Sequence, residues 1–138
     1  GFSGNAKGEP AMAEYIAKLD MSCFVFDYDF NAPTVDFLKN THHQFFEIVR
    51  KKNPMLPIII MSMPYNAWVK DIGERKRIIK ETFDLAVAGG DENVYFVDGE
   101  KTFDIFGGDS GTVDGTHPND LGFMCMALEL EKYIEKLV

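Results

Sequence analysis

Three short apolar runs alternate along the chain with longer segments in which apolar residues recur at helical spacing. The runs cover residues 22–26, 57–61 and 93–97 and are rich in β-branched and aromatic residues. An uninterrupted apolar run of this length is typical of a strand that is covered on both faces. Because a helical segment separates each run from the next, the pattern predicts an α/β fold with a parallel sheet.

Start and stop signals bound the helical segments. Pro10 suits the first turn of a helix, because no intrahelical partner is needed for its missing N–H there. Thr34 can cap a second helix, which the Asn53-Pro54 pair ends, and Gly89-Gly90 ends a third. Four helices are therefore predicted, at residues 10–19, 34–52, 70–88 and from about residue 119 onward.

Composition and charge narrow the class of protein. The 138 residues are 46% hydrophobic and 26% charged, which is ordinary for one globular domain spanning residues 1–138. The net charge of −8 disfavours nucleic acid as a partner. The longest apolar run, from Leu56 to Met61, is too short to span a bilayer. The compartment stays open, since a signal peptide could have preceded Gly1.

Neither the cysteines nor the paired histidines favour a metal site. Cys23 and Cys125 are far apart and have no Cys-x-x-Cys spacing, so reduced core residues are a better reading than a disulfide or metal ligands. His42 and His43 are adjacent in a predicted helix and cannot share a face. We expect neither a metal nor an organic cofactor.

The unusual residues gather in three loops that follow predicted strands. In an open parallel sheet, active sites form beyond the carboxyl ends of the strands, which places loops 27–33, 62–68 and 107–118 on one edge. In the last loop, the spacing of Asp114 and His117 suits a carboxylate that orients an imidazole for nucleophilic catalysis. The alternative is a loop histidine that hydrogen-bonds a carbonyl, with a capping or turn role for Asp114.

At these residues the chain resembles the SGNH (GDSL-type) hydrolases, and within them a GDSL-like lipase/acylhydrolase subgroup. The opening Gly-Phe-Ser-Gly-Asn string is similar to the family's second sequence block and matches Gly4 to its oxyanion-hole glycine. Asn31, which follows a strand, matches the oxyanion asparagine of the third block, and Asp114 and His117 match the fourth. The resemblance implies a flavodoxin-like three-layer sandwich of esterases and acylhydrolases.

The chain departs from the family pattern at two places. The third block usually reads Gly-x-Asn-Asp, whereas residues 29–32 keep only the asparagine. The first block, which holds the nucleophilic serine, is absent, so the resemblance implies that the serine and at least one strand and helix precede Gly1. Ser110 in the Gly-Asp-Ser string of residues 108–110 is a poor substitute, because no strong helix signal follows it; Ser3 and Ser62 are weaker still.

The truncation predicts two properties of the 138 residues alone. They should lack esterase activity, and they should associate with one another through the exposed edge of the strand at residues 22–26.

Around the site, Asp29, Tyr65 and Trp68 are candidates for a substrate pocket. Tyr65 and Trp68 could equally cover the helix that follows, and Asp29, with Asp27, could be solvated or ion-paired rather than form a carboxylate pair.

Two functions follow from these residues. The first is a Ser-His-Asp ester hydrolase, with a small-molecule ester as its partner. Small acyl or acetyl esters, including those of carbohydrates, are the substrates that the resemblance suggests. The second is a non-catalytic binding module of the same fold that has lost its nucleophile, and a Gly-x-Ser after an upstream apolar strand would favour the enzyme.

Overall fold

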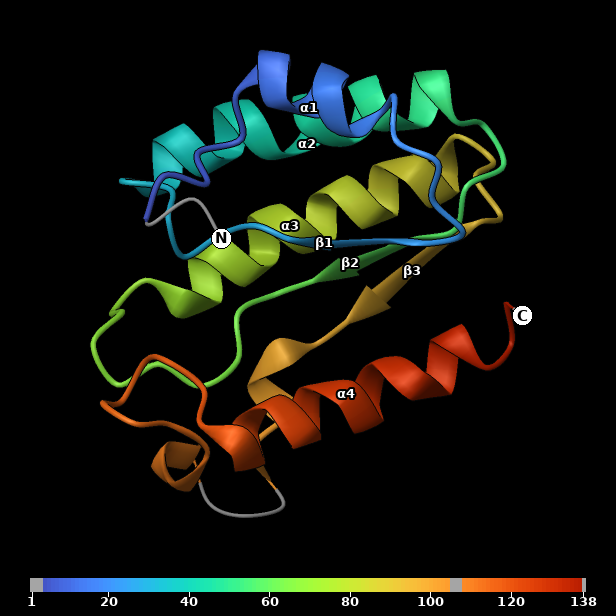
Figure 1. The fold of residues 1–138 in the computed structure, drawn as a ribbon. Helices are drawn as coiled ribbons and strands as arrows, with labels where there is room; N and C mark the ends of the chain where they lie inside the picture. The colour runs from blue at the N-terminus through green and yellow to red at the C-terminus, as the bar shows by residue number, and fades with distance from the viewer. Residues whose placement is uncertain (1–3, 105–107, 138) are drawn as a thin grey trace.

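The computed structural model describes residues 4–104 and 108–137. Three strands form one parallel sheet in the order β1-β2-β3: β1 (Phe24–Asp27), β2 (Ile58–Met61) and β3 (Val94–Val97) (Figure 1). Each strand lies in one of the three apolar runs, apart from Asp27 at the end of β1, so the predicted strands and their parallel direction are confirmed. The opening tripeptide with Ser3, and Gly107 of the third loop, lie outside the described residues, and what was expected of them stays a prediction.

Four α-helices cover the sheet in two layers. Helices α1 (Pro10–Ile16), α2 (Val35–Lys52) and α3 (Ile72–Ala88) lie on one face, and α4 (Asp120–Ile134) lies on the other (Figure 1). Short 3₁₀ turns, η1 (Gly99–Lys101) and η3 (Gly108–Gly111), belong to the connection between β3 and α4. This arrangement confirms the α/β fold with helices on both faces of a parallel sheet.

The helix ends differ from the predicted ones where side chains or tighter turns intervene. The Thr34 hydroxyl accepts a hydrogen bond from the backbone N–H of Phe37 at 3.1 Å, as expected of a cap. Helix α1 ends at Ile16, earlier than predicted, because the N–H groups of Lys18 and Leu19 reach back only three residues, to the carbonyls of Tyr15 and Ile16. Helix α3 begins only at Ile72, because Asn66 holds residues 66–69 in a separate turn through its side-chain oxygen.

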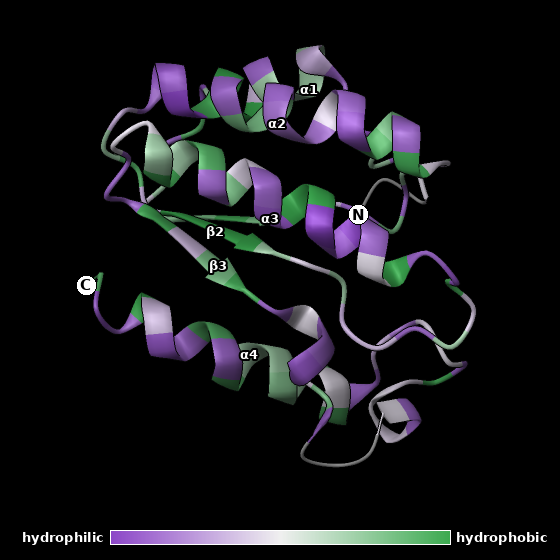
Figure 2. Cartoon of the chain, turned by 180° about the vertical axis from the view of Figure 1, so that it is seen from behind, coloured by the Kyte–Doolittle hydropathy of each residue, from purple (hydrophilic) through white to green (hydrophobic). Residues whose placement is uncertain are grey.

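Two apolar clusters hold the layers together. Beneath α1, α2 and α3, aromatic rings stack around Phe26, whose centroid lies 5.0 Å from that of Phe45. On the other face, β2 and β3 pack against Leu130 and Tyr133 of α4. Strand β2 is buried on both faces, and Figure 2 shows this apolar strand between the helical layers. Cys23 and Cys125 are both free thiols, as expected.

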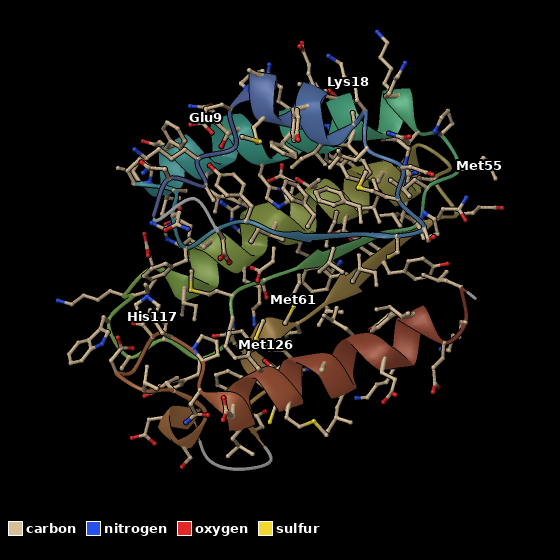
Figure 3. The ribbon with its side chains drawn as sticks, viewed as in Figure 1. Glu9, Lys18, Met55, Met61, His117 and Met126 are labelled. Carbon is tan, nitrogen blue, oxygen red and sulfur yellow. The ribbon has the colours of Figure 1, made fainter. Side chains whose placement is uncertain are left out.

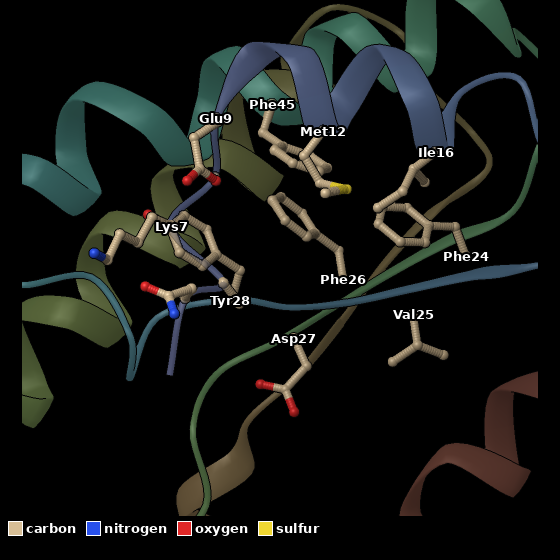
Figure 4. Close-up of a pocket in the computed structure, with 13 residues that line it drawn as sticks. Lys7, Glu9, Met12, Ile16, Phe24, Val25, Phe26, Asp27, Tyr28 and Phe45 are labelled. Atoms are coloured by element: carbon tan, nitrogen blue, oxygen red, sulfur yellow. The ribbon is translucent and has the colours of Figure 1, made fainter. Parts of the chain in front are cut away.

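Strand β1 lies at the edge of the sheet, and a pocket of about 190 Å³ lies along it, lined by residues of β1, of α1 and of the segment before α1. Figure 4 shows Met12 and Ile16 of α1 above Phe24 and Phe26 in this pocket, with Asp27 on the other side of the strand. Within the described residues, β1 pairs with β2 alone, so its other edge offers backbone groups without a strand partner. Such an edge favours pairing with a further strand.

Candidate active site

The three loops predicted to share one rim do meet at the carboxyl ends of the strands. Figure 3 shows His117 on this side of the molecule, to which the strands run. A pocket of about 210 Å³ lies between the loops. Its lining comes from the exit of β1, the exit of β2, the loop before α4 and α4 itself, and includes Asp27, Asp29, Met63, Tyr65, His117 and Met126.

Asp114 and His117 form a hydrogen-bonded pair at the mouth of this pocket. His117 Nδ1 lies 2.7 Å from Asp114 Oδ2, and the backbone N–H groups of Thr116 and His117 donate to Asp114 Oδ1 at 3.0 and 2.8 Å. The backbone hydrogen bond from His117, with the one from its ring, lowers the pKa of the Asp114 carboxyl. Both side chains are open to solvent, His117 to 70%. The pair therefore leaves Nε2 of His117 available to a reacting group.

The loop that carries the pair closes on itself. Thr112 and Pro118 form an isolated antiparallel bridge, and Val113 N donates to His117 O at 2.9 Å. Gly115 turns the chain with a φ of +84°, a conformation that favours glycine. These contacts hold the aspartate and histidine on one short, closed loop.

Trp68 supports this loop instead of covering helix α3. Its indole Nε1 donates to the Asp114 carbonyl at 2.9 Å, and the neighbouring Ala67 N donates to Gly115 O at 2.8 Å. The Trp68 side chain stays 72% exposed and lines a shallow depression with Tyr65, Asp114 and Gly115. Tyr65 also lines the deeper pocket with His117. The β2 exit loop is thus joined to the loop of the Asp-His pair by two hydrogen bonds.

Asp29 is buried below the pocket, with 2% of its surface exposed. Its Oδ2 accepts a hydrogen bond from Met63 N at 2.7 Å, while Oδ1 has no partner among the described residues. Burial raises the pKa of Asp29 to about 7, and the nearby Asp27 charge adds to the rise. Desolvation also raises the pKa of Asp27 to about 6, although this carboxylate reaches solvent on one side. Asp27 and Asp29 both line this pocket.

Arg75 is the residue of this region that the sequence pattern did not single out. From the first turn of α3, its Nη1 donates to the carbonyls of Asp29 and Ala32 at 2.8 and 3.0 Å. Its Nε donates to Asp71 Oδ1 at 2.9 Å, and only 8% of the side chain is exposed. An arginine at helical spacing from an aspartate reads as a surface ion pair, so no local signal distinguishes this buried contact.

The two predicted oxyanion residues lie outside the lining of the His117 pocket. Asn31 is half-buried in the turn between Asp29 and Ala32, and its side-chain amide makes no hydrogen bond with another described residue. Gly4 adopts a φ of +76° in an exposed turn. Their roles in an oxyanion hole therefore stay predictions.

No described serine lines the His117 pocket. Ser62 is buried, and its hydroxyl accepts a hydrogen bond from Gly99 N at 3.0 Å, which ties it to the turn after β3. Ser110 lies in η3, where its carbonyl accepts from the Asn119 side chain at 2.9 Å.

In the described parts of the chain, no three His, Cys, Asp or Glu side chains cluster as metal ligands would. Across residues 4–104 and 108–137, no helix has the length and apolar character needed to cross a membrane.

A match to a known family identifies the family to which this chain belongs. The profile of the GDSL-like Lipase/Acylhydrolase family matches residues 1–135. The chain belongs to this family. No curated protein sequence matches it significantly.

Solved structures share the fold of this chain. A GDSL-like lipase from Bacteroides ovatus is 28% identical, with a TM-score of 0.83 over 97% of this chain and 41% of its own. The salicylyl-acyltransferase SsfX3 from a tetracycline biosynthetic pathway is 19% identical, with a TM-score of 0.81 over 99% of this chain and 44% of its own. A family 3 carbohydrate esterase from Clostridium thermocellum is 18% identical, with a TM-score of 0.69 over 93% and 65%. The GDSL-like chain spans less than half the length of the first two proteins, and the likeness to the last two concerns the fold alone.

Proposed function

We propose that this GDSL-like chain supplies the acid–base half of an ester hydrolase whose nucleophilic serine lies upstream of Gly1. Family membership supports a general esterase function. The observation that carries the finer proposal is the 2.7 Å contact between His117 Nδ1 and Asp114 Oδ2 beside a pocket at the carboxyl ends of the strands. An imidazole held by a carboxylate through one nitrogen, with the other nitrogen open, is the arrangement that general-base activation of a serine requires.

The proposed reaction uses His117 twice. As the serine oxygen bonds to the ester carbonyl carbon, His117 Nε2 accepts the hydroxyl proton, and Asp114 stabilises the imidazolium that forms. The bond between the carbonyl carbon and the alcohol oxygen then breaks, and His117 gives its proton to the leaving alcohol. Water repeats the sequence on the acyl-serine, which releases the carboxylic acid and restores the serine.

Asn31 and Gly4 are the proposed donors to the oxyanion. The amide of Asn31 has no hydrogen-bond partner among the described residues, so it can donate to an incoming group. Gly4 would add its backbone N–H. Removing one such donor typically costs roughly 100- to 1000-fold in turnover.

The proposed substrates are small acyl or acetyl esters, with acylated carbohydrates as the class we favour. A pocket of about 210 Å³ accommodates a short acyl group better than a long chain. Its lining includes the exposed residue Asp27 and the ring of Tyr65, which offer a hydrogen-bond acceptor and a ring face to a hydroxylated alcohol.

Hydrolysis of p-nitrophenyl acetate by four proteins tests the proposal. These are the 138-residue chain, a version extended upstream of Gly1, and the extended version carrying either His117→Ala or His43→Ala. We expect activity in the extended protein and in its His43→Ala control, whose imidazole lies on α2 outside the pocket. His117→Ala should lower turnover roughly 100- to 10,000-fold, and the 138 residues alone should be inactive.

Two results would overturn this assignment. Activity of the 138-residue chain that Ser110→Ala abolishes would make Ser110 the nucleophile. Folded extended protein that neither hydrolyses the ester nor reacts with a serine-directed phosphonate would favour the non-catalytic binding module.

A further inference from the structure

We infer that Arg75 and Asp29 are positioning residues that hold the Asn31 turn at the rim of the site. The inference rests on the proposed oxyanion role of Asn31 and deepens it. Asn31 sits in a turn closed by a hydrogen bond from Ala32 N to Asp29 O at 3.1 Å. The carbonyls on both sides of Asn31, those of Asp29 and Ala32, accept from the same Arg75 nitrogen at 2.8 and 3.0 Å. One guanidinium thus holds both ends of the turn.

The Asp29 side chain fixes the same turn from the opposite direction. Its Oδ2 accepts from Met63 N at 2.7 Å, which joins the exit of β1 to the exit of β2. Asp29, Ala32 and Arg75 are all buried, so these hydrogen bonds are shielded from competing water. The turn is therefore connected to α3 through Arg75 and to the middle strand through Asp29.

A fixed turn matters because an oxyanion donor acts by being in place before charge develops. A donor that must reorganise during the reaction loses much of its benefit. The Asn31 amide has no hydrogen bond of its own to another described residue, so its position depends on the backbone that carries it. Loosening the turn should lower the rate of the chemical step more than it weakens substrate binding.

Arg50 offers a matched control at the opposite end of the sheet. Its guanidinium also donates to backbone carbonyls, those of Leu56 and Asn93 among them, at 2.6 and 3.1 Å, and pairs with Asp91 at 2.7 Å. The Arg50 side chain is 15% exposed, close to the 8% of Arg75. Replacing either arginine by methionine removes an ion pair and at least two hydrogen bonds to backbone carbonyls, but only Arg75 contacts the Asn31 turn.

The kinetic test is a double-mutant cycle in the protein extended upstream of Gly1. Arg75→Met should lower kcat about 10- to 100-fold with KM changed less than about threefold, because the lost donor alone is worth about 100- to 1000-fold. In an Asn31→Ala background the same substitution should cost less than about threefold. Arg75→Lys, which keeps one charged donor, should recover part of the rate, and Arg50→Met should leave kcat per folded molecule unchanged. An equal loss with and without Asn31 would overturn the inference.

A structural test on the 138-residue chain separates this inference from the proposed function. In NMR spectra, Arg75→Met and Asp29→Leu should each shift the Ala32 amide and the Asn31 side-chain amide, and speed exchange of the Ala32 amide at least about tenfold relative to Arg50→Met. Inactive extended protein with these shifts would reject the esterase proposal but support the positioning of the Asn31 turn by Arg75 and Asp29. Unchanged Asn31 and Ala32 signals would reject that positioning role whatever the activity. If Arg75→Met does not fold, Arg75→Lys carries both tests, and a variant indistinguishable from the unmutated protein would count against the inference.

Discussion

Removing the imidazole of His42 should change how the stability of this chain depends on pH. His42 lies on the buried face of α2 and is fully buried, its ring centroid lies 4.5 Å from that of Phe26, and Nδ1 lies 2.8 Å from Thr82 Oγ1. Its Nε2 is buried and has no partner among the described residues. A proton on this ring would create a buried charge without a counter-ion, and burial accordingly lowers the pKa of His42 to about 3.

The sign of the effect follows from the two states. The unfolded chain binds the His42 proton below its ordinary pKa of 6.5, whereas the folded chain does so only near pH 3. Stability from this group is complete above about pH 6.5 and is lost as the pH falls, by about 1.4 kcal/mol per pH unit. Asp29 acts in the opposite sense. Its folded pKa of about 7 lies above the ordinary 3.8, so its contribution is complete below about pH 4 and is lost as the pH rises to about 7.

The two slopes oppose each other between about pH 4 and about pH 6.5, and each variant exposes the slope of the other residue. We expect the stability of His42→Asn, relative to the unmutated chain, to rise by about 3 kcal/mol as the pH falls through this window. Asn can still reach Thr82, and any constant loss of stacking cancels in the comparison between pH values. Asp29→Asn should show the converse, with stability relative to the unmutated chain falling by a similar amount over the same window.

Urea unfolding followed by far-UV circular dichroism at several pH values between about 4 and about 7 measures these differences. An unchanged m-value checks that the unfolded states are comparable. His43→Asn, at the next position of α2 with a partly exposed ring, controls for the loss of a histidine from this helix. A stability difference between His42→Asn and the unmutated chain that stays constant within about 0.5 kcal/mol over this pH range would refute the reasoning. The expected change of about 3 kcal/mol is far larger than the error of a matched comparison.

Three further outcomes follow from the packing and the sheet edge. Gly99→Ala should destabilise the chain by about 3 kcal/mol or more in urea unfolding, because the added Cβ would lie 1.8 Å from Ser62 O, a backbone atom that cannot move alone. Trp68→Phe removes the N–H donated to Asp114 O and should cost about 1 kcal/mol in the same assay, with an unaltered stability counting against that hydrogen bond. The 138-residue chain should associate at micromolar concentration through the free edge of β1, and light scattering from a stable monomer would contradict this.

Local sequence patterns were sufficient to predict the elements of the fold. The apolar runs contain the three strands except for Asp27 at the end of β1, and Thr34 caps α2 through its side chain. The Asp114–His117 spacing predicted a carboxylate–imidazole contact, because three residues of a tight loop bring such side chains within reach. These features depend on residues close together in the chain.

The contacts that organise the rim could not be predicted in this way. The Arg75 contacts with Asp29 and Ala32 span 46 and 43 residues, and the Trp68 contact with Asp114 spans 46. Such pairings exist only after α3 and the sheet have packed, and no propensity or spacing rule specifies them. The predicted choice for Trp68, between lining a substrate pocket and covering the following helix, omitted the role that its indole N–H has in supporting the loop of the Asp-His pair.

Arg50 and Arg75 stabilise opposite ends of the sheet. Arg50 on α2 donates to carbonyls of segments that enter β2 and β3, where the pocket beside His117 does not reach. Arg75 on α3 donates to the turn that leaves β1, beside that pocket. Both donate to backbone carbonyls of segments that flank the strands, so both stabilise the fold. Only the second restrains a loop that faces the proposed chemistry, so a comparison of the two variants separates a stability effect from a catalytic one.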